Sequence, residues 1–183
     1  VVPDQAFVQY IREVCTKYGI VFVSDEIQAG FSRTGKNFGI EHFDVEPDLM
    51  TISKSMGAGV PISGVIGKKE IMESAGVGEI GGTYSGSPLG CQAALAVLDI
   101  MEEEKLNDRA NSIGKQVKER MNKLANQYDQ VGDIRGLGAM VAVEIVNGKN
   151  DKTPNKKVVG QIVEEANNKE YPVTAYLDYK EMF

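Results

Sequence analysis

The chain has 183 residues, of which 42% are hydrophobic and 25% charged, and its formal net charge is −6 at pH 7. This is the composition of a globular domain large enough to bury a sizeable core. The acidic balance argues against a broad nucleic-acid surface, which needs clustered Lys and Arg. No apolar run approaches the roughly 20 residues of a membrane-spanning helix.

The two cysteines, Cys15 and Cys91, lie far apart in the sequence and form no CxxC or Cys/His cluster. We therefore expect buried thiols rather than a disulfide or a metal site, and a protein of the reducing cytoplasm. The single histidine, His42, cannot form a metal site with a second histidine. No secretory leader is visible. Both ends look unfinished, so we interpret the chain as a piece of a longer protein.

The first half of the chain carries the pattern of an α/β domain. Helical spacing of apolar residues predicts a helix over residues 3–19, ended by Gly19. The continuous apolar run "IVFVS", residues 20–24, is typical of a strand buried on both faces of a parallel sheet. Further strands are predicted at 48–53 and 62–67.

A glycine-rich loop over residues 76–86 precedes an Ala/Leu-rich helix. Ser87 is a candidate N-cap of that helix, and Pro88 suits its first turn. A second helix is predicted from about 108 to 127, because apolar residues are spaced for one helical face.

The character of the sequence changes near Gly132. "IRGLGAMVAVEIV" predicts a glycine turn followed by one strand with alternating sides, "NGKNDKTPN" a polar loop, and 155–169 a helix. We therefore divide the chain into residues 1–131, part of a large domain that is incomplete at its amino end, and residues 132–183, part of a small α+β domain with an aberrant tail.

Three chemical features converge on one edge of the predicted sheet. Asp25 follows the first strand and Lys54 the second, so both lie on the same rim if the strands are parallel. The loop that contains Thr83 leads into a helix N-terminus, where free N–H groups and the helix dipole favour an anion. A lysine, a carboxylate and an anion site together suit pyridoxal phosphate, whose aldehyde, ring nitrogen and phosphate they would bind.

Each feature alone has a more ordinary explanation. A lysine after a strand is usually solvated, an aspartate at a strand end usually forms a turn, and most glycine loops are only loops. "GAGVPISG" does not match the GxGxxG dinucleotide pattern.

The particular residues of the motifs distinguish a pyridoxal-phosphate site from these ordinary explanations. "DEIQAGFSRTGKNFGIEHFDVEPDLMTISKSMGAGVPISGVIG" and "GGTYSGSPLGCQAALAVLDI" closely resemble the class III pyridoxal-phosphate aminotransferases over about residues 1–169. Within that class, "RTGKNFGIEHFDVEPDL" and "IRGLGAMVAVEI" are most similar to the 4-aminobutyrate aminotransferases. The resemblance implies an α/β fold of the type I pyridoxal-phosphate transferases: part of the mostly parallel large-domain sheet, and the start of the small domain.

The resemblance also implies roles for four residues. Lys54 matches the Schiff-base lysine, which also moves a proton between Cα and C4′, and Asp25 matches the carboxylate paired with the pyridine nitrogen. Gln28 matches the residue near the cofactor's phenolic oxygen, and Thr83 the threonine that reaches the phosphate in the neighbouring subunit of a homodimer. On this basis we expect Asp25 to be a buried charge and Lys54 a buried amine.

The activity implied is transfer of the amino group of 4-aminobutyrate to 2-oxoglutarate, giving succinate semialdehyde and glutamate. Another ω-amino-acid or ornithine-type aminotransferase, or an aminomutase, is the alternative within the fold. A non-catalytic remnant is the alternative of another class, because the family's amino-terminal half and carboxyl-terminal arginine are missing here and the sequence after Lys169 departs from the family pattern.

Other conspicuous residues receive structural interpretations. We expect Glu26 to face solvent or to support local structure, Arg33 to support its loop, and His42 to be structural rather than catalytic. A lone chain of this length would expose sheet edges to water, which favours instability or aggregation.

Overall fold

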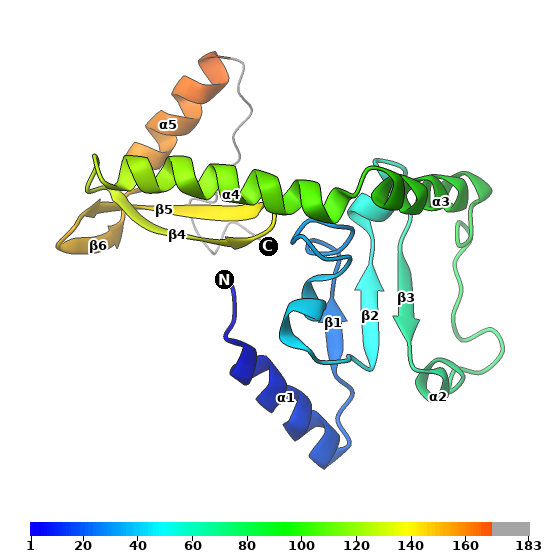
Figure 1. The fold of residues 1–183 in the computed structure, drawn as a ribbon. Helices are drawn as coiled ribbons and strands as arrows, with labels where there is room; N and C mark the ends of the chain where they lie inside the picture. The colour runs from blue at the N-terminus through cyan, green and yellow to red at the C-terminus, as the bar shows by residue number, and fades with distance from the viewer. Residues whose placement is uncertain (170–183) are drawn as a thin grey trace. The chain divides into compact units, whose positions relative to one another are not determined.

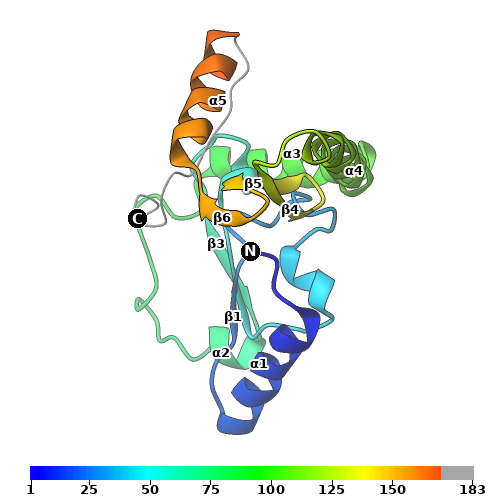
Figure 2. The same cartoon turned by 90° about the vertical axis from the view of Figure 1, so that its left-hand side faces the viewer.

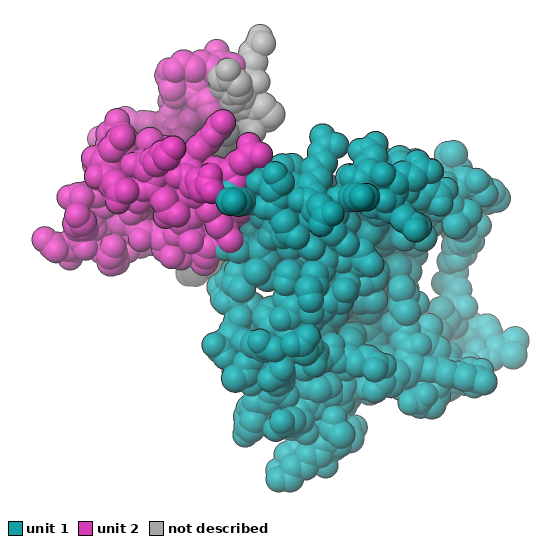
Figure 3. Space-filling model, viewed as in Figure 1, with its two compact units in different colours: residues 1–115, 136–140 teal, residues 116–135, 141–183 magenta. Residues whose placement is uncertain are grey.

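The computed structural model describes residues 1–169, so the predicted change of character after Lys169 lies outside the described residues. The chain divides into two compact units (Figure 3). Unit 1 comprises Val1–Lys115 and Gly136–Met140, and unit 2 comprises Gln116–Arg135 and Val141–Phe183.

Unit 1 begins with helix α1 (Gln5–Tyr18), and both ends of this helix are capped. The Asp4 side chain accepts a hydrogen bond from the Ala6 amide at 2.8 Å. Gly19 adopts a left-handed conformation with φ of 64°, and its amide donates to the last carbonyls of the helix. The predicted end at Gly19 is therefore confirmed, because a residue without a side chain adopts this conformation at little cost.

The sheet of unit 1 has the order β1-β2-β3 (Figures 1 and 2). Strands β1 (Val23–Asp25) and β2 (Leu49–Ile52) are parallel, and β3 (Gly64–Gly67) is antiparallel to β2. The parallel pairing on which the predicted rim depends is thus present. The first strand starts at Val23 rather than at residue 20, because the Phe22 amide donates to the Asp48 side chain instead of to a neighbouring strand.

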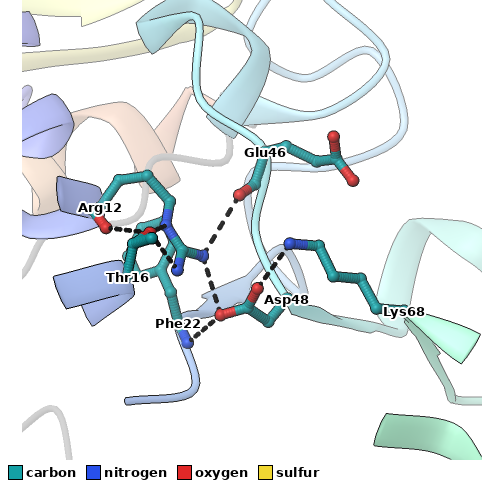
Figure 4. A network of polar contacts seen from close by, with 6 residues as sticks. All are labelled: Arg12, Thr16, Phe22, Glu46, Asp48 and Lys68. Atoms are coloured by element: carbon teal, nitrogen blue, oxygen red, sulfur yellow. Dashed lines mark hydrogen bonds and ion pairs between the residues drawn. The ribbon is translucent and has the colours of Figure 1, made fainter. Parts of the chain in front are cut away.

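A charged cluster around Asp48 joins α1 to the beginning of the parallel pair (Figure 4). The Asp48 carboxylate accepts hydrogen bonds from Arg12 Nη1, the Phe22 amide and Lys68 Nζ, each at 2.8 Å. The Arg12 guanidinium also lies over the Phe22 ring, 5.4 Å from its centroid. Because Asp48 is only 7% exposed, these contacts satisfy a carboxylate that is largely removed from water.

The short helices and the long helix α3 complete unit 1. Helix α1 packs against the 3₁₀ turn η1 (Gly39–Phe43), and α3 (Pro88–Glu103) packs against the turn η2 (Lys54–Gly57). Helix α2 (Lys69–Met72) lies near the end of the sheet where β1 starts, and α3 lies at the opposite end (Figures 1 and 2). Ser87 occupies the predicted N-cap position of α3, but its side chain makes no capping hydrogen bond.

Residues 136–140 return to unit 1 after an excursion of 20 residues and pack on the loop that follows β1. The Ala139 amide donates to the Arg33 carbonyl at 3.0 Å. Gly138 has φ of +49°, and a Cβ placed on it would lie 2.3 Å from the carbonyl carbon of Thr34. Neither the backbone conformation nor the space at this position admits a side chain.

We expect Gly138→Ala to destabilise the chain more than Gly19→Ala does. Both positions have a positive φ, but no atom lies within 4 Å of a Cβ on Gly19. The left-handed conformation costs about 1 kcal/mol in either variant, and the backbone clash at Gly138 adds roughly 2 kcal/mol. Urea unfolding of the two variants measures the difference, and equal losses would contradict the close packing of the 136–140 turn.

Unit 2 contains helix α5 (Lys156–Asn168) and most of the second sheet, whose order is β4-β5-β6. Strands β4 (Val131–Leu137) and β5 (Met140–Gly148) form a hairpin, where the sequence predicted a turn and one strand. The predicted polar loop contains strand β6 (Asp151–Pro154), antiparallel to β5. Helix α5 lies within the predicted 155–169, with Asn155 capping it by accepting from the Val158 amide at 3.1 Å. Helix α4 (Leu106–Ala125) supplies residues to both units.

Much apolar surface remains uncovered in the described residues. Val23 on β1 and Val65 and Ile66 on β3 are each about half exposed. Cys91 is exposed and Cys15 partly so, and both are free thiols; the expectation of a buried thiol was wrong for Cys91, which projects from α3. Within residues 1–169, no helix is long and apolar enough to cross a membrane, and no cluster of three or more metal-ligating side chains occurs.

Candidate functional site

The candidate site lies at the carboxyl ends of β1 and β2. The register pairs Asp25, the last residue of β1, with Thr51 on β2. Lys54 follows two residues after β2 and begins the turn η2, with φ of 44°. The parallel pairing therefore brings the predicted carboxylate and the predicted lysine to one rim, as Figure 1 shows for the strands that carry them.

The Asp25 carboxylate is held by hydrogen bonds from neighbouring residues at the same end of the sheet. Its Oδ1 accepts hydrogen bonds from the Ile27 amide at 3.1 Å and from the Thr51 hydroxyl at 3.0 Å. Among the described residues, Oδ2 has no hydrogen-bond donor. Asp25 is exposed in this chain, so the expectation of a buried charge was wrong: the strand ends at the open edge of the sheet, and no described residue covers it.

Gln28 and Lys54 meet across the same edge. Lys54 Nζ donates a hydrogen bond to Gln28 Oε1, which links the loop after β1 to the turn after β2. Lys54 is exposed, so the expected desolvation of its amine is not supplied by the described residues. Asp25, Gln28 and Lys54 are thus brought together, with the amine and the free carboxylate oxygen open to solvent.

Thr83 belongs to a different part of unit 1. It lies in the exposed loop between α2 and α3, which runs beside β3 rather than β1 (Figure 1). The contacts made by Asp25, Gln28 and Lys54 do not include it. The chain therefore presents the predicted phosphate ligand apart from the other three residues.

The most buried side chain beside the site is Glu26, which is 2% exposed. Its Oε2 accepts from the Gly39 amide at 2.8 Å, and its Oε1 accepts from the Ile40 amide at 2.8 Å and from the Ser24 hydroxyl at 3.0 Å. Of the two expected environments, the structural one is correct and solvent is not. The sequence alone does not distinguish the two environments, because two of the three partners are backbone amides 13 and 14 residues away.

Two further side chains support the rim. Thr51, which was not among the predicted site residues, orients Asp25 through its hydroxyl. Its position three residues before Lys54, on the neighbouring strand, is the sequence feature that could have indicated it. Arg33 Nε donates to the Ser55 hydroxyl at 3.1 Å and so supports its loop, as expected. His42 Nε2 lies 3.0 Å from the Thr34 carbonyl, which agrees with a structural role.

A carboxylate and a lysine amine on the shared rim of two parallel strands define an α/β protein with a candidate ligand site at its strand ends. The model of the Aminotransferase class-III family matches residues 1–171, and the chain belongs to this family.

Two curated relatives share most of the chain. A Bacillus subtilis protein named "Probable 4-aminobutyrate aminotransferase" is 53% identical over 91% of the chain and 38% of its own length. The 5-aminovalerate aminotransferase DavT of Pseudomonas aeruginosa is 44% identical over 92% of the chain and 39% of its own length. The chain therefore spans somewhat more than a third of the length of these two relatives.

A solved structure shares the fold. The taurine:2-oxoglutarate aminotransferase of Bifidobacterium kashiwanohense, in complex with PLP and glutamate, superposes with a TM-score of 0.88 at 29% identity over 96% of the chain and 41% of that structure. The expected fold class, part of the α/β fold of type I pyridoxal-phosphate transferases, is confirmed by this likeness.

Proposed function

We propose that the chain is part of a pyridoxal-phosphate-dependent aminotransferase that moves the amino group of 4-aminobutyrate to 2-oxoglutarate. The observation that carries the proposal is the shared rim, with Lys54 Nζ against Gln28 and Asp25 beside them. The family match over residues 1–171 supports the reaction class. The products would be succinate semialdehyde and glutamate.

The rim residues fit pyridoxal phosphate in their donor and acceptor chemistry. Asp25 Oδ2 has no donor among the described residues, so it is available to accept a hydrogen bond from a protonated ring nitrogen. The Thr51 hydroxyl and the Ile27 amide, both on Oδ1, would fix the direction of that oxygen. When bound, the cofactor supplies an aldehyde that bonds to an amine and a ring that withdraws electrons.

The remaining roles follow from which groups can move or hold a proton. Lys54 would hold the cofactor by condensing its amine with the aldehyde, which releases water, and once substrate takes its place the freed amine would carry a proton between the substrate's Cα and C4′ of the cofactor. Gln28 would hold the free amine through its carbonyl and lie near the phenolic oxygen. Thr83, on its exposed loop, would reach the phosphate bound by a second copy in a homodimer.

The amino donor is proposed from the curated relatives. The name of the Bacillus subtilis protein favours 4-aminobutyrate, and DavT acts on 5-aminovalerate, one methylene longer. One methylene in an apolar pocket changes selectivity by only about 10–200-fold. The order of kcat/KM for the two donors in a complete enzyme that contains this sequence tests the assignment.

The domain division is part of the proposal. We assign residues 1–131 to the cofactor-binding large domain and residues 132–183 to the small carboxyl-terminal domain. A chain that spans 38% of a relative's length leaves out more than half of that relative's residues, so we expect the isolated chain to show weak or no turnover. Sustained transamination by the 183-residue chain would contradict this expectation.

Labelling of the isolated chain tests the cofactor assignment. The purified chain is mixed with pyridoxal phosphate, the adduct is fixed with borohydride, and the modified peptides are mapped. We expect saturable labelling centred on Lys54. Labelling spread evenly over surface lysines would contradict a retained pocket and favour the non-catalytic remnant.

A further inference from the structure

We propose that Glu26 is a positioning residue for the cofactor: its buried carboxylate fixes the backbone beyond Asp25, so that Asp25 meets the ring nitrogen. This inference rests on the proposed function and extends it to a residue that does not itself face the site. The evidence lies in the contacts that Glu26 makes in three directions, to its own strand, to the neighbouring strand and to a distant loop.

The backbone of Glu26 continues the parallel pairing beyond the last residue of β1. Its amide donates to the Thr51 carbonyl at 2.9 Å, and its carbonyl accepts from the Gly30 amide at 2.9 Å. Thr51 is also the residue whose hydroxyl holds Asp25 Oδ1. The peptide between Asp25 and Glu26 is therefore tied to the same residue of β2 that orients the Asp25 carboxylate.

The Glu26 side chain points away from the rim and into unit 1. It joins Ser24 of β1 to the amides of Gly39 and Ile40 at the start of η1. The packing there is close, because a Cβ on Gly39 would lie 3.3 Å from Glu26 Oε2. The Ser24 and Glu26 side chains meet on this inner side, and side chains of successive residues in extended backbone point to opposite faces, so the Asp25 side chain between them points to the other face, where it is exposed.

The Glu26 side chain accepts all three of its hydrogen bonds and donates none, so replacement by glutamine is a sensitive test of its role. An amide of nearly the same shape would place an NH₂ group against at least one of these N–H or O–H groups. Because Glu26 is 2% exposed, water cannot easily replace the lost acceptor. The repulsion between the NH₂ group and these donors is expected to displace the peptide between Asp25 and Glu26. It should not open a cavity, because the two side chains are nearly equal in size.

Glu41 provides the matched control. Its Oε1 accepts from the Phe38 amide at 2.6 Å, so it too binds a backbone amide of the loop before η1. Glu41 is exposed and makes no contact with β1 among those described. Glu41→Gln therefore applies the same chemical change to the same loop without touching the strand end.

The test compares binding of two compounds to the full 183-residue chain: pyridoxal phosphate and its analogue in which the ring nitrogen is replaced by carbon. Glu26→Gln is expected to weaken pyridoxal phosphate about tenfold, the effect of one poorly made hydrogen bond to a charged group. The nitrogen-free analogue has no N–H to offer Asp25, so its binding should change by less than about twofold. Glu41→Gln should leave both unchanged.

Hydrogen exchange supplies a readout without cofactor. The Ile27 amide donates to Asp25 Oδ1, so its exchange should become faster in Glu26→Gln and stay unchanged in Glu41→Gln. If Glu26→Gln fails to fold, Ser24→Ala removes one donor to the same carboxylate and should produce the same pattern with smaller changes.

The outcomes separate the two proposals. Equal weakening of both compounds by Glu26→Gln, or no weakening of either, would overturn the positioning role and leave the proposed function intact. Failure of the unaltered chain to take up pyridoxal phosphate at Lys54 would overturn the proposed function, and the Glu26 proposal with it.

Discussion

Replacing Lys54 with alanine is expected to abolish the saturable uptake of pyridoxal phosphate by the chain. The amine of Lys54 lies at the shared rim, where it contacts Gln28 Oε1 and can bond to the cofactor's aldehyde carbon. In a complete enzyme that contains this sequence, the same change should lower kcat for amino transfer by roughly 10³-fold or more, because it removes both the covalent attachment and the proton carrier. Absorbance titration and steady-state kinetics measure the two effects.

The control for Lys54→Ala is Lys69→Ala. Lys69 lies on α2 with its side chain 81% exposed and pairs only weakly with Glu73 at 3.7 Å. Its loss removes one lysine without altering the rim, so cofactor uptake by the chain and kcat of the complete enzyme should both stay unchanged. If Lys54→Ala still binds the cofactor as tightly as the unaltered chain, another lysine carries the attachment and the site assignment is wrong.

Replacing Asp48 with asparagine is expected to lower the free energy of unfolding by about 2–3 kcal/mol. Asp48 accepts two charged donors and one backbone amide, and it does so while largely buried. An amide in its place puts an NH₂ group against one of those donors and leaves the Arg12 guanidinium, 17% exposed, without its counter-charge. Urea unfolding at pH 7 measures the loss.

Asp44→Asn is the matched control for Asp48→Asn. Asp44 is exposed, and its carboxylate accepts one hydrogen bond, from Gln5 Nε2 at 2.8 Å. An asparagine oxygen can still accept that bond, so we expect the free energy of unfolding to change by less than about 0.5 kcal/mol. Similar losses in the two variants would show that the Asp48 cluster contributes little.

The effect of Asp48 should fade in acid. The hydrogen bond from Lys68 first, then those from the Phe22 amide and Arg12, hold the pKa of Asp48 well below its ordinary value. An unfolded aspartate titrates near pH 4, so the folded chain binds this proton less readily than the unfolded chain does. The stabilisation is therefore complete above about pH 4 and declines as the pH falls below it. The gap between the unaltered chain and Asp48→Asn should narrow at pH 3.

The sequence predicts those site residues whose position is determined by the ends of the strands. Asp25 and Lys54 follow two apolar runs, and two parallel strands necessarily place such residues on one rim. Their exposure could not be predicted from the same pattern, because burial depends on what covers the rim. The apolar run at 20–24 also predicted a longer strand than exists, since nothing local indicates that the Phe22 amide binds the Asp48 carboxylate.

Long-range contacts account for the other differences. The sequence around Glu26 is typical of an acidic residue at a turn. Its burial depends on hydrogen bonds from the Gly39 and Ile40 amides, which are distant in the sequence. Strand β6 has a polar, proline-containing sequence typical of a loop, and only its pairing with β5 makes it a strand. Sequence patterns indicate local structure, whereas the structure of these residues depends on contacts with residues distant in the sequence.

The return of residues 136–140 to unit 1 has a consequence for how the chain can be divided. A shortened chain ending at Lys115 would contain the whole rim but would leave the Arg33 carbonyl without the Ala139 amide. Forming that contact closes a loop of more than a hundred residues, and the entropic cost of such closure delays it relative to local pairing. Unit 1 is therefore completed only after the hairpin has been synthesised, and no uninterrupted segment shorter than about residues 1–140 can reproduce it.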